Sequence, residues 1–468
     1  MITMSRRVVL SACWVAMVVC IAGSHGNAQV GNIAASGVPL CSPAPCIVPP
    51  VWPATNVFAV NAPIAADPQN PRQLLLGSVN SDCSGVGPGF YLSRDGGSSW
   101  QQRCLPSFSY KGNEYLPINQ PTVGYDSQGT AYEAAQYEFF DDSSSAALVA
   151  FQKSSDGGQT WSAPAPAAGH KNAAPGFSRL VVDASITSPH VNSVYIATVF
   201  LAPIVSAAKN QLVVSHSSDG GEHWARVPLT PVEPNDRREL RNPNLTVGRE
   251  GTVYVTWLLR NVFDPSSRAE VLFSKSSDGG NTWSQPTRIA TVVLHGLPNA
   301  LLAVPINTPA VGVDDSGGPN SGDLYIAMDT WTGIYLRVGV VRSAADGNTW
   351  SKPVWVAPPS ETHDQFFPWL SVSPAGLVGV SWMDRRNDPN NVEYQPFAAI
   401  SRDGGQSFGP NVQLSTGFSD PNRGGEGNGW IGDYTGNTWA GPDYFVAAWM
   451  DNSNSTYMED VVGGIRLK

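Results

Sequence analysis

The sequence predicts an all-β fold, a single β-propeller built from four-stranded blades, and three observations lead to this prediction. An eight-residue box that ends in Trp or Phe recurs along the chain at intervals near sixty residues. Short β-branched and aromatic runs, bounded by Gly, Asp and Asn, precede the boxes, as expected of strands. The 468 residues include 46 Gly, 38 Pro and 15 Trp, a composition typical of frequent turns and unfavourable to long helices.

The box first appears at Ser93–Trp100 and is interpreted as a tight hairpin. Complete copies follow at Ser154–Trp161, Ser217–Trp224, Ser276–Trp283 and Ser401–Phe408, and a shortened copy at Asp346–Trp350 lacks one Gly. The repeated aspartates are Asp95, Asp156, Asp219, Asp278, Asp346 and Asp403, at spacings of 61, 63, 59, 68 and 57, which suit one blade per repeat. The Asp can accept backbone hydrogen bonds and the Gly pair can adopt positive φ. A residue repeated in every unit is predicted to be structural, not catalytic.

A seventh unit ends the chain without a box. Its strands are predicted at residues 430–436, 444–449 and 461–467, with a fourth strand supplied by the N-terminal segment around residues 50–60. Such a strand closes the ring and removes the open sheet edges. Seven blades are therefore favoured, with six blades and an irregular closure as the alternative. The predicted organisation is a leader at 1–28, a tether rich in Pro, Ala and Gly at 29–55, and the propeller at 56–468.

The leader has the features of an export signal. Arg6 and Arg7 precede an apolar run from Val8 to Ala22, and small residues end at Ala28, the predicted cleavage point. The chain is thus expected to be secreted or to reside in the periplasm or cell envelope, through either a Sec or a twin-arginine signal. No later segment is long and apolar enough to predict a membrane span.

The cysteines and the charge narrow the class further. Once the leader is removed, four cysteines remain, and we predict the disulfides Cys41–Cys46 and Cys83–Cys104. No His lies near them at ligand spacing, so no metal site is expected, and no phosphate-binding or zinc motif predicts a cofactor. The net charge is −10 with the leader and −12 without Arg6 and Arg7, which argues against nucleic-acid binding.

With six boxes at blade spacing, the chain resembles the Asp-box, or BNR-repeat, proteins of the sialidase superfamily over most of residues 60–467. In sialidases of this family an arginine triad binds the substrate carboxylate. A Tyr with a Glu partner is the nucleophile, and an Asp is the acid/base. The family's first-blade Phe/Tyr-Arg-Ile-Pro motif is absent here, and Arg241-Asn242-Pro243 is only a faint echo of it in the fourth unit.

The boxes join the third and fourth strands, so the loops around the pore on the opposite face, the top face, are the expected site. By the resemblance, the expected substrate-binding residues there are Arg179, Arg241, Arg260, Arg385 and Arg386. Guanidinium groups can hold a carboxylate bidentately. Asp384 or Asp329 is the expected acid/base, and Tyr434, assisted by Glu138, is the expected nucleophile. The alternative is structural: Trp-Met-Asp recurs at 382–384 and 449–451, which favours salt bridges and turn caps between blades.

The resulting functional expectation is an exported, sialidase-like propeller that binds, and as an exo-glycosidase hydrolyses, a glycan or other anionic carbohydrate at its top face. A monomer is expected. The alternative is a non-catalytic exported scaffold that binds a protein or a cell-envelope partner. Six tryptophans could form an aromatic platform at the pore or belong to the core: Trp257, Trp331, Trp369, Trp382, Trp430 and Trp449.

Overall fold

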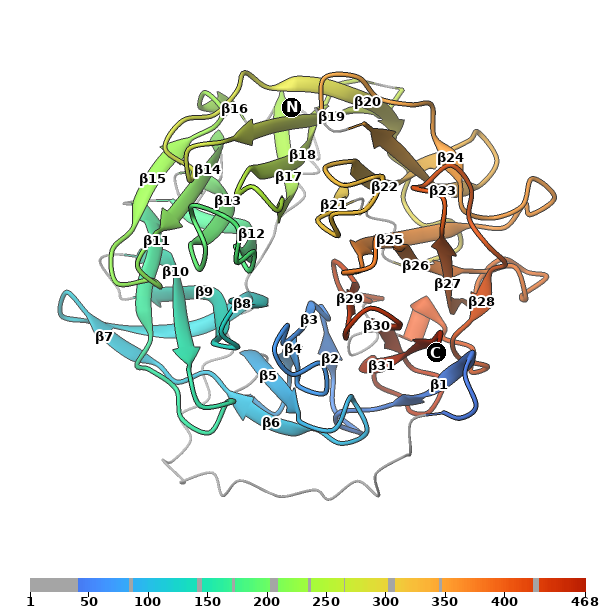
Figure 1. Ribbon diagram of the computed structural model, residues 1–468, viewed down its shortest axis with the longest axis horizontal. Coiled ribbons are helices and arrows are strands. Elements are labelled where there is room, and N and C mark those ends of the chain that lie inside the picture. The colour runs from blue at the N-terminus through green and yellow to red at the C-terminus, as the bar shows by residue number, and fades with distance from the viewer. Residues whose placement is uncertain are drawn as a thin grey trace, which may run out of the picture. The chain divides into compact units, whose positions relative to one another are not determined.

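Seven antiparallel sheets arranged around a central axis make up the described part of the chain (Figure 1). The computed structural model describes residues 41–83, 87–140, 145–170, 173–202, 209–234, 237–264, 266–301, 308–344, 347–423 and 429–468. The predicted leader, residues 29–40 of the predicted tether and Asp346 lie outside these ranges. Within them the one helical element is the 3-10 turn η1 (Pro421–Arg423). The predicted β-propeller is confirmed, with seven blades.

The first three blades follow one another along the chain. Blade 1 contains β2 (Ala59–Val60), β3 (Ile64–Ala66), β4 (Leu74–Asn80), β5 (Gly87–Ser93) and β6 (Gln101–Cys104). Blade 2 contains β7 (Phe108–Tyr110), β8 (Asn113–Tyr125), β9 (Ala131–Phe140), β10 (Ser145–Ser154) and β11 (Ala165–His170). Blade 3 contains β12 (Ala174–Val182), β13 (Val194–Ala202), β14 (Lys209–Ser217), β15 (Ala225–Pro228) and β16 (Glu233–Pro234).

The remaining blades have four strands each. Blade 4 contains β17 (Arg238–Val247), β18 (Val253–Asn261), β19 (Arg268–Ser276) and β20 (Thr287–Val293). Blade 5 contains β21 (Ala310–Val313), β22 (Leu324–Trp331), β23 (Leu336–Ser343) and β24 (Val354–Trp355). Blade 6 contains β25 (Gln365–Val372), β26 (Val378–Asp384), β27 (Gln395–Ser401) and β28 (Val412–Gln413). Blade 7 contains β29 (Gly436–Trp439), β30 (Tyr444–Asp451), β31 (Glu459–Arg466) and, from the start of the chain, β1 (Cys46–Val51).

Blade 7 closes the ring with strands from both ends of the chain. β1 pairs antiparallel with β31, with Cys46 opposite Arg466 and Val51 opposite Val462. The closing strand was expected around residues 50–60, so it lies earlier in the sequence and inside the range expected to be a tether. Pro49 and Pro50 obscure it in the sequence, but an outermost strand tolerates proline because the missing N–H can face away from the ladder.

The closing strand offers a direct test of the ring. Val48 of β1 is buried in the hydrophobic cluster between blades, whereas Ile47 beside it is 46% exposed. We expect Val48→Asp to lower the free energy of unfolding by roughly 2–4 kcal/mol, because it buries an unpaired carboxylate. Ile47→Asp, the matched control on the solvent side, should change it by less than about 1 kcal/mol. Urea unfolding measures both, and equal effects would contradict the closure.

The inner strand of blade 7 differs from its expected position. The sequence predicted it at residues 430–436, whereas β29 begins only at Gly436. Gly432 adopts a φ of 88°, a left-handed conformation, and pairing with β30 begins only at Gly436. Residues 429–435 consequently pass over the top face as an irregular segment and become available to line a site.

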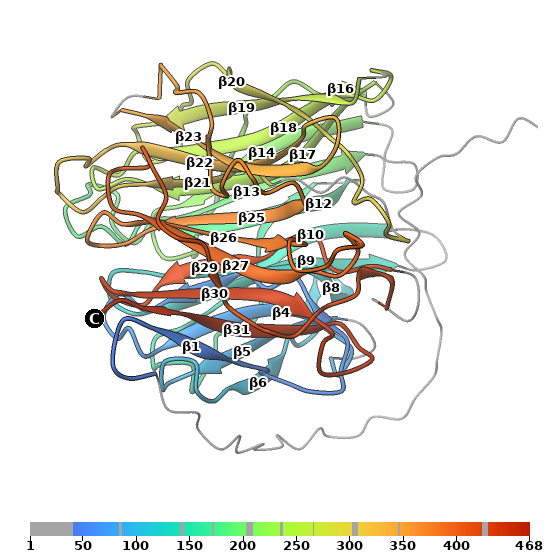
Figure 2. The same ribbon diagram turned by 90° about the vertical axis from the view of Figure 1, so that its right-hand side faces the viewer.

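The core lies between the blades. Trp257, Trp382 and Trp449 are each no more than 1% exposed and pack between neighbouring sheets, so for these three tryptophans the core interpretation holds. Trp369 and Trp430 remain only partly buried. The strands run between two opposite faces of the propeller (Figure 2), which places the connections of each blade alternately on one face and the other.

The boxes form hairpins between the third and fourth strands of their blades. In the first, the Asp95 carboxylate accepts hydrogen bonds from the Ser93 hydroxyl and the Ser99 backbone N–H, both at 2.9 Å, while Gly97 adopts a φ of 95°. The Trp100 indole N–H donates to the Gly97 carbonyl at 3.0 Å. The same carboxylate bonds recur at Asp156, Asp219, Asp278 and Asp403. Hydrogen bonds, chiefly from Thr160, lower the pKa of Asp156 to about 2.

Both predicted disulfides are present. Cys41–Cys46 joins residues whose Cα atoms are 5.9 Å apart, and Cys83–Cys104 joins residues 5.3 Å apart across the outer part of blade 1. None of the segments that the structure describes folds into a helix with the length and hydropathy of a membrane span.

Candidate functional site

A small pocket, with an interior volume of about 30 Å³, opens on the top face of blades 5, 6 and 7. Its wall comes from four places: the loop after β20, the adjoining ends of β22 and β23, the start of β25 and the irregular segment before β29. The principal side chains lining this top-face pocket are His295, Leu297, Asp329, Leu336, Phe366 and Trp430. Its lining is largely apolar with few polar groups, as is characteristic of small-molecule sites.

Asp329 is the carboxyl group of the pocket. It lies near the end of β22, opposite Val338, and is 4% exposed. Burial raises its pKa to about 8, with a backbone hydrogen bond opposing the shift. The side chain is therefore predominantly neutral at pH 7 and can donate a proton, as a buried acid with a raised pKa does in general acid catalysis.

Asp329 is preceded by a different residue from the corresponding aspartates of blades 6 and 7. In those blades the indole N–H of the Trp two positions earlier donates to the aspartate, from Trp382 to Asp384 at 2.7 Å and from Trp449 to Asp451 at 3.3 Å. Ala327 occupies the Trp position in blade 5. The Trp that supplies the indole donor in blades 6 and 7 is thus replaced by Ala in blade 5.

Aromatic side chains surround the mouth and wall of the pocket. His295 stacks on Trp331, with ring centroids 3.9 Å apart and planes 16° apart. Phe367 has a φ of 51° at a β-bulge in β25, a conformation that costs about 1–3 kcal/mol for a bulky residue. The bulge interrupts the strand register between Phe366 and Trp369, and both Phe366 and Phe367 line the pocket.

Two of the expected arginines lie behind this pocket, in a buried cluster at the pore. The Arg179 guanidinium carbon is 3.4 Å from the centroid of the Tyr434 ring. Arg241 is also buried, and burial lowers the pKa of both arginines while the Asp433 carboxylate opposes the change. Asp433 accepts a hydrogen bond from Trp430 at 3.4 Å, which links this residue of the pocket to the cluster.

Acids of the chain itself neutralise the arginine cluster. Arg241 is 3.7 Å from Glu239, and Arg260 makes an ion pair with the same carboxylate. The structure therefore brings Arg179, Arg241 and Arg260 into one region, as the clamp hypothesis requires, but supplies internal carboxylates for them. The Tyr434 hydroxyl is buried and donates to the Pro121 carbonyl at 2.8 Å.

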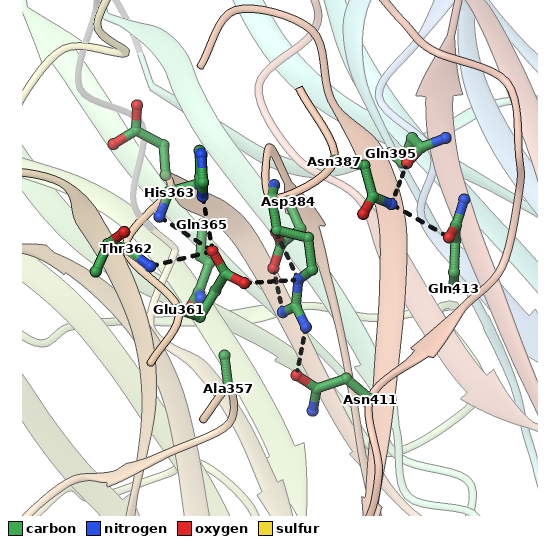
Figure 3. Close-up of polar contacts among 12 residues, drawn as sticks. Ala357, Glu361, Thr362, His363, Gln365, Asp384, Asn387, Gln395, Asn411 and Gln413 are labelled. Carbon is green, nitrogen blue, oxygen red and sulfur yellow. Dashed lines mark hydrogen bonds and ion pairs between the residues drawn. The ribbon is translucent and has the colours of Figure 1, made fainter. Parts of the chain in front are cut away.

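Asp384 and Arg386 form a separate polar cluster on blade 6. The Arg386 backbone N–H and Nε each donate to Asp384 Oδ1 at 2.9 Å, and Arg386 Nη1 donates to Asn411 at 3.0 Å. Figure 3 shows Asp384, Glu361 and Asn411 within this network, with Asn387, Gln395 and Gln413 forming a second group nearby. Glu361 lies 3.9 Å from Arg386 and also contacts His363. Both Asp384 and Arg386 are engaged with other side chains of the same blade or its neighbour.

Arg385 points away from Arg386 and is fully buried. Its Nη1 atom donates to the carbonyls of Pro298 and Asn391, at 2.6 and 2.9 Å, and lies 3.2 Å from Asp364. The guanidinium carbon is 5.7 Å from the Phe366 ring centroid. Phe366 lines the pocket and Arg385 does not, and the bond from Arg385 to Pro298 holds the loop that forms part of the wall.

Glu138 lies apart from the other candidates. It is 9% exposed near the end of β9, accepts a hydrogen bond from Gln136, and has a pKa raised by burial. Among the described residues, no contact joins it to Tyr434. In the described ranges no group of three or more His, Cys, Asp or Glu side chains has the arrangement of a metal site.

Comparison with known proteins extends to the fold. The chain is similar to a polysaccharide lyase of family 25, an ulvan lyase bound to -[GlcA(1-4)Rha3S]-, with a TM-score of 0.50, 13% identity, and coverage of 89% of this chain and 96% of that one. A Dyadobacter fermentans protein gives a TM-score of 0.49 at 13% identity, covering 90% of this chain and 99% of that one. The Hadza microbial sialidase Hz136 gives 0.47 at 15% identity, covering 85% and 75%. No family model and no curated sequence matches the chain. At these identities the likeness establishes the propeller alone.

Sequence reasoning selected Asp329 but missed most of the pocket around it. Leu297, Leu336 and Phe366 carry no chemical signature in the sequence. Two signals were available: the replacement of Trp by Ala327 in the repeated strand ending, and the Phe366-Phe367-Pro368 sequence at the start of an inner strand. Comparable bulges precede Pro121 and Pro243, where Gln120 and Asn242 adopt φ values of 57° and 49°.

Proposed function

We propose that the chain is an exported, sialidase-like propeller that holds the end of a glycan in the top-face pocket and hydrolyses its terminal linkage. The observation that carries this proposal is the placement of Asp329, a carboxyl group with a pKa of about 8, among the apolar and aromatic walls of the pocket. A pocket bounded on several sides suits a chain end, so the proposed mode of action is that of an exo-glycosidase.

The chemistry assigned to Asp329 is proton donation. Hydrolysis of a glycosidic bond requires a proton on the leaving oxygen, and enzymes supply it from a carboxylic acid kept neutral by an apolar environment. The Trp430 ring and the Phe366 ring offer flat apolar surfaces for the C–H faces of a sugar. In this proposal Arg179, Arg241, Arg260 and Tyr434 support the pocket from behind, whereas Asp384, Arg385, Arg386 and Glu138 maintain the blades.

The export proposal draws support from the two disulfides. Both lie in the N-terminal part of the chain, and such bonds persist in secreted, periplasmic or cell-surface proteins. The signal features of residues 1–28 are consistent with that destination.

A non-catalytic scaffold is the second candidate, and one observation favours it. Arg385 is paired with Asp364, and Arg386 with Asp384, so each of these arginines has a carboxylate partner within the protein. Under this hypothesis the glycan pocket would be inert, and a protein or envelope partner would bind elsewhere on the same face.

Turnover and binding by the chain from Gln29 onward distinguish the two candidates. We expect hydrolysis within a panel of fluorogenic glycosides that includes a sialoside, and binding to a glycan array. Trp430→Ala should reduce either signal at least tenfold because it removes a wall of the pocket. Trp355→Ala, an exposed tryptophan on the outer strand β24, should leave it unchanged. An absence of both turnover and binding across the panel would favour the scaffold.

A further inference from the structure

The charges around the top-face pocket restrict what it can hold. Of the described residues that line it, none is Lys or Arg, and the titratable side chains are His295 and Asp329. A carboxylate or sulfate on a bound sugar is stabilised in a buried site by cationic donors, and without them its desolvation is uncompensated. The described lining offers the Asp329 carboxyl group instead. When it ionises, it repels the negative charge of an anionic sugar.

The buried arginines Arg385 and Arg179 lie near residues of the pocket wall but do not line the pocket. The Arg385 guanidinium carbon is 5.7 Å from the Phe366 ring centroid, and its Nη1 atom donates to the Pro298 carbonyl. Arg179 lies beside Tyr434 and Asp433, and Asp433 is in turn bonded to Trp430. Both arginines are buried, and both already have partners within the protein.

The walls suit the opposite class of ligand. Leu297, Leu336, Phe366 and Trp430 present apolar surface to the C–H faces of a sugar ring. A neutral carboxyl group on Asp329 can both donate to and accept from sugar hydroxyls. We propose that the pocket is selective for a terminal sugar unit that bears no charged group, in contrast to a sialic acid or a uronic acid. This inference rests on the proposed function and specifies its substrate class.

A matched pair of ligands tests the selectivity at neutral pH. The probes are a methyl hexoside and the methyl hexuronide of the same ring configuration, which differ only in replacing the hydroxymethyl group by a carboxylate. Two such pairs are compared. The first has the ring configuration of the neutral methyl glycoside that binds best, and the second has the configuration of the uronide that binds best. We expect the neutral member to bind wild-type protein at least about tenfold more tightly in calorimetry, equivalent to ~1.4 kcal/mol.

A charge-introducing variant provides the second arm. Ala300 is half-buried at the pocket, and Ala300→Arg should narrow or reverse the preference by supplying the missing cation. Ala300→Gln, the matched neutral control, should keep the wild-type preference. Tighter binding of the uronide by wild-type protein would overturn the neutral-sugar inference and leave glycan binding intact. Binding of neither class would overturn the inference together with the proposed function.

Discussion

Replacing Asp329 with Asn should abolish most of the glycosidase turnover, by about 10²–10⁴-fold in kcat/KM, because the amide cannot donate a proton to the leaving group. In the wild-type protein, turnover should fall as the pH rises through about 8, where the Asp329 carboxyl ionises. A pH profile of kcat/KM measures both effects. A wild-type profile that stays level between pH 7 and pH 9 would exclude Asp329 as the proton donor.

Asp460→Asn is the matched control for this experiment. Asp460 lies on β31, is 2% exposed, and has a pKa that burial likewise raises to about 8, but it does not line the pocket. The control variant should retain the turnover and the pH profile of the wild type. Equal losses in both variants would indicate a general effect of buried acids on the fold.

The same two variants have a predicted effect on stability. The folded-state pKa of Asp329 lies above the unfolded value of about 4, so the stabilising contribution of its neutral form is fully present below pH 4. That contribution is lost as the pH rises through about 8, at up to about 1.4 kcal/mol per pH unit. Urea unfolding at several pH values should therefore show a shallower decline for Asp329→Asn and for Asp460→Asn than for the wild type.

Replacing Arg385 with Met should lower the free energy of unfolding by about 3–5 kcal/mol, because the buried Asp364 carboxylate loses its charge partner. Asp364 also accepts a hydrogen bond from the Leu336 backbone N–H at 2.8 Å. A change at Asp364 is therefore expected to disturb the pocket wall at Leu336. In the double variant Arg385→Met/Asp364→Asn part of the stability should return, since no buried charge remains unpaired. Urea unfolding of the two single variants and the double variant measures this coupling.

The Arg385 experiment also separates a structural role from substrate binding. If Arg385 bound a substrate carboxylate, Arg385→Met would raise KM for anionic substrates selectively and leave stability nearly unchanged. We expect the reverse pattern, with a large loss of stability and no selective loss for anionic ligands.

The fold could be predicted from the sequence because the blades repeat, and each repeat carries a similar sequence motif. Six boxes at regular intervals carry their own turn chemistry, and their spacing determines how many strands each unit contributes. The closing strand was placed too late because prolines at positions 49 and 50 contradict ordinary strand preferences, which an outermost strand can ignore.

The candidate site could be predicted from the sequence only in part, because it depends on the directions in which side chains point. Arg385 and Arg386 are adjacent in sequence, yet one is buried against Phe366 and the other lies beside Asp384. The pocket joins segments of three blades, and of its apolar walls only the Phe366-Phe367-Pro368 segment carries a signal in the sequence. Asp329 could have been distinguished from Asp384 in advance, because only Asp384 follows a Trp at the repeated position.

The pairing of β1 with β31 has a consequence for how the molecule is made. Cys46 lies opposite Arg466, so β1 must wait for β31, far along the chain, before the final blade exists. Until then β1 is unpaired, and its backbone groups can pair with another chain. Such a contact between distant parts of the chain has a high entropic cost of closure and forms late in folding. A ring joined in this way is completed only after β31 has been produced, and, for an exported protein that crosses unfolded, only on the far side of the membrane.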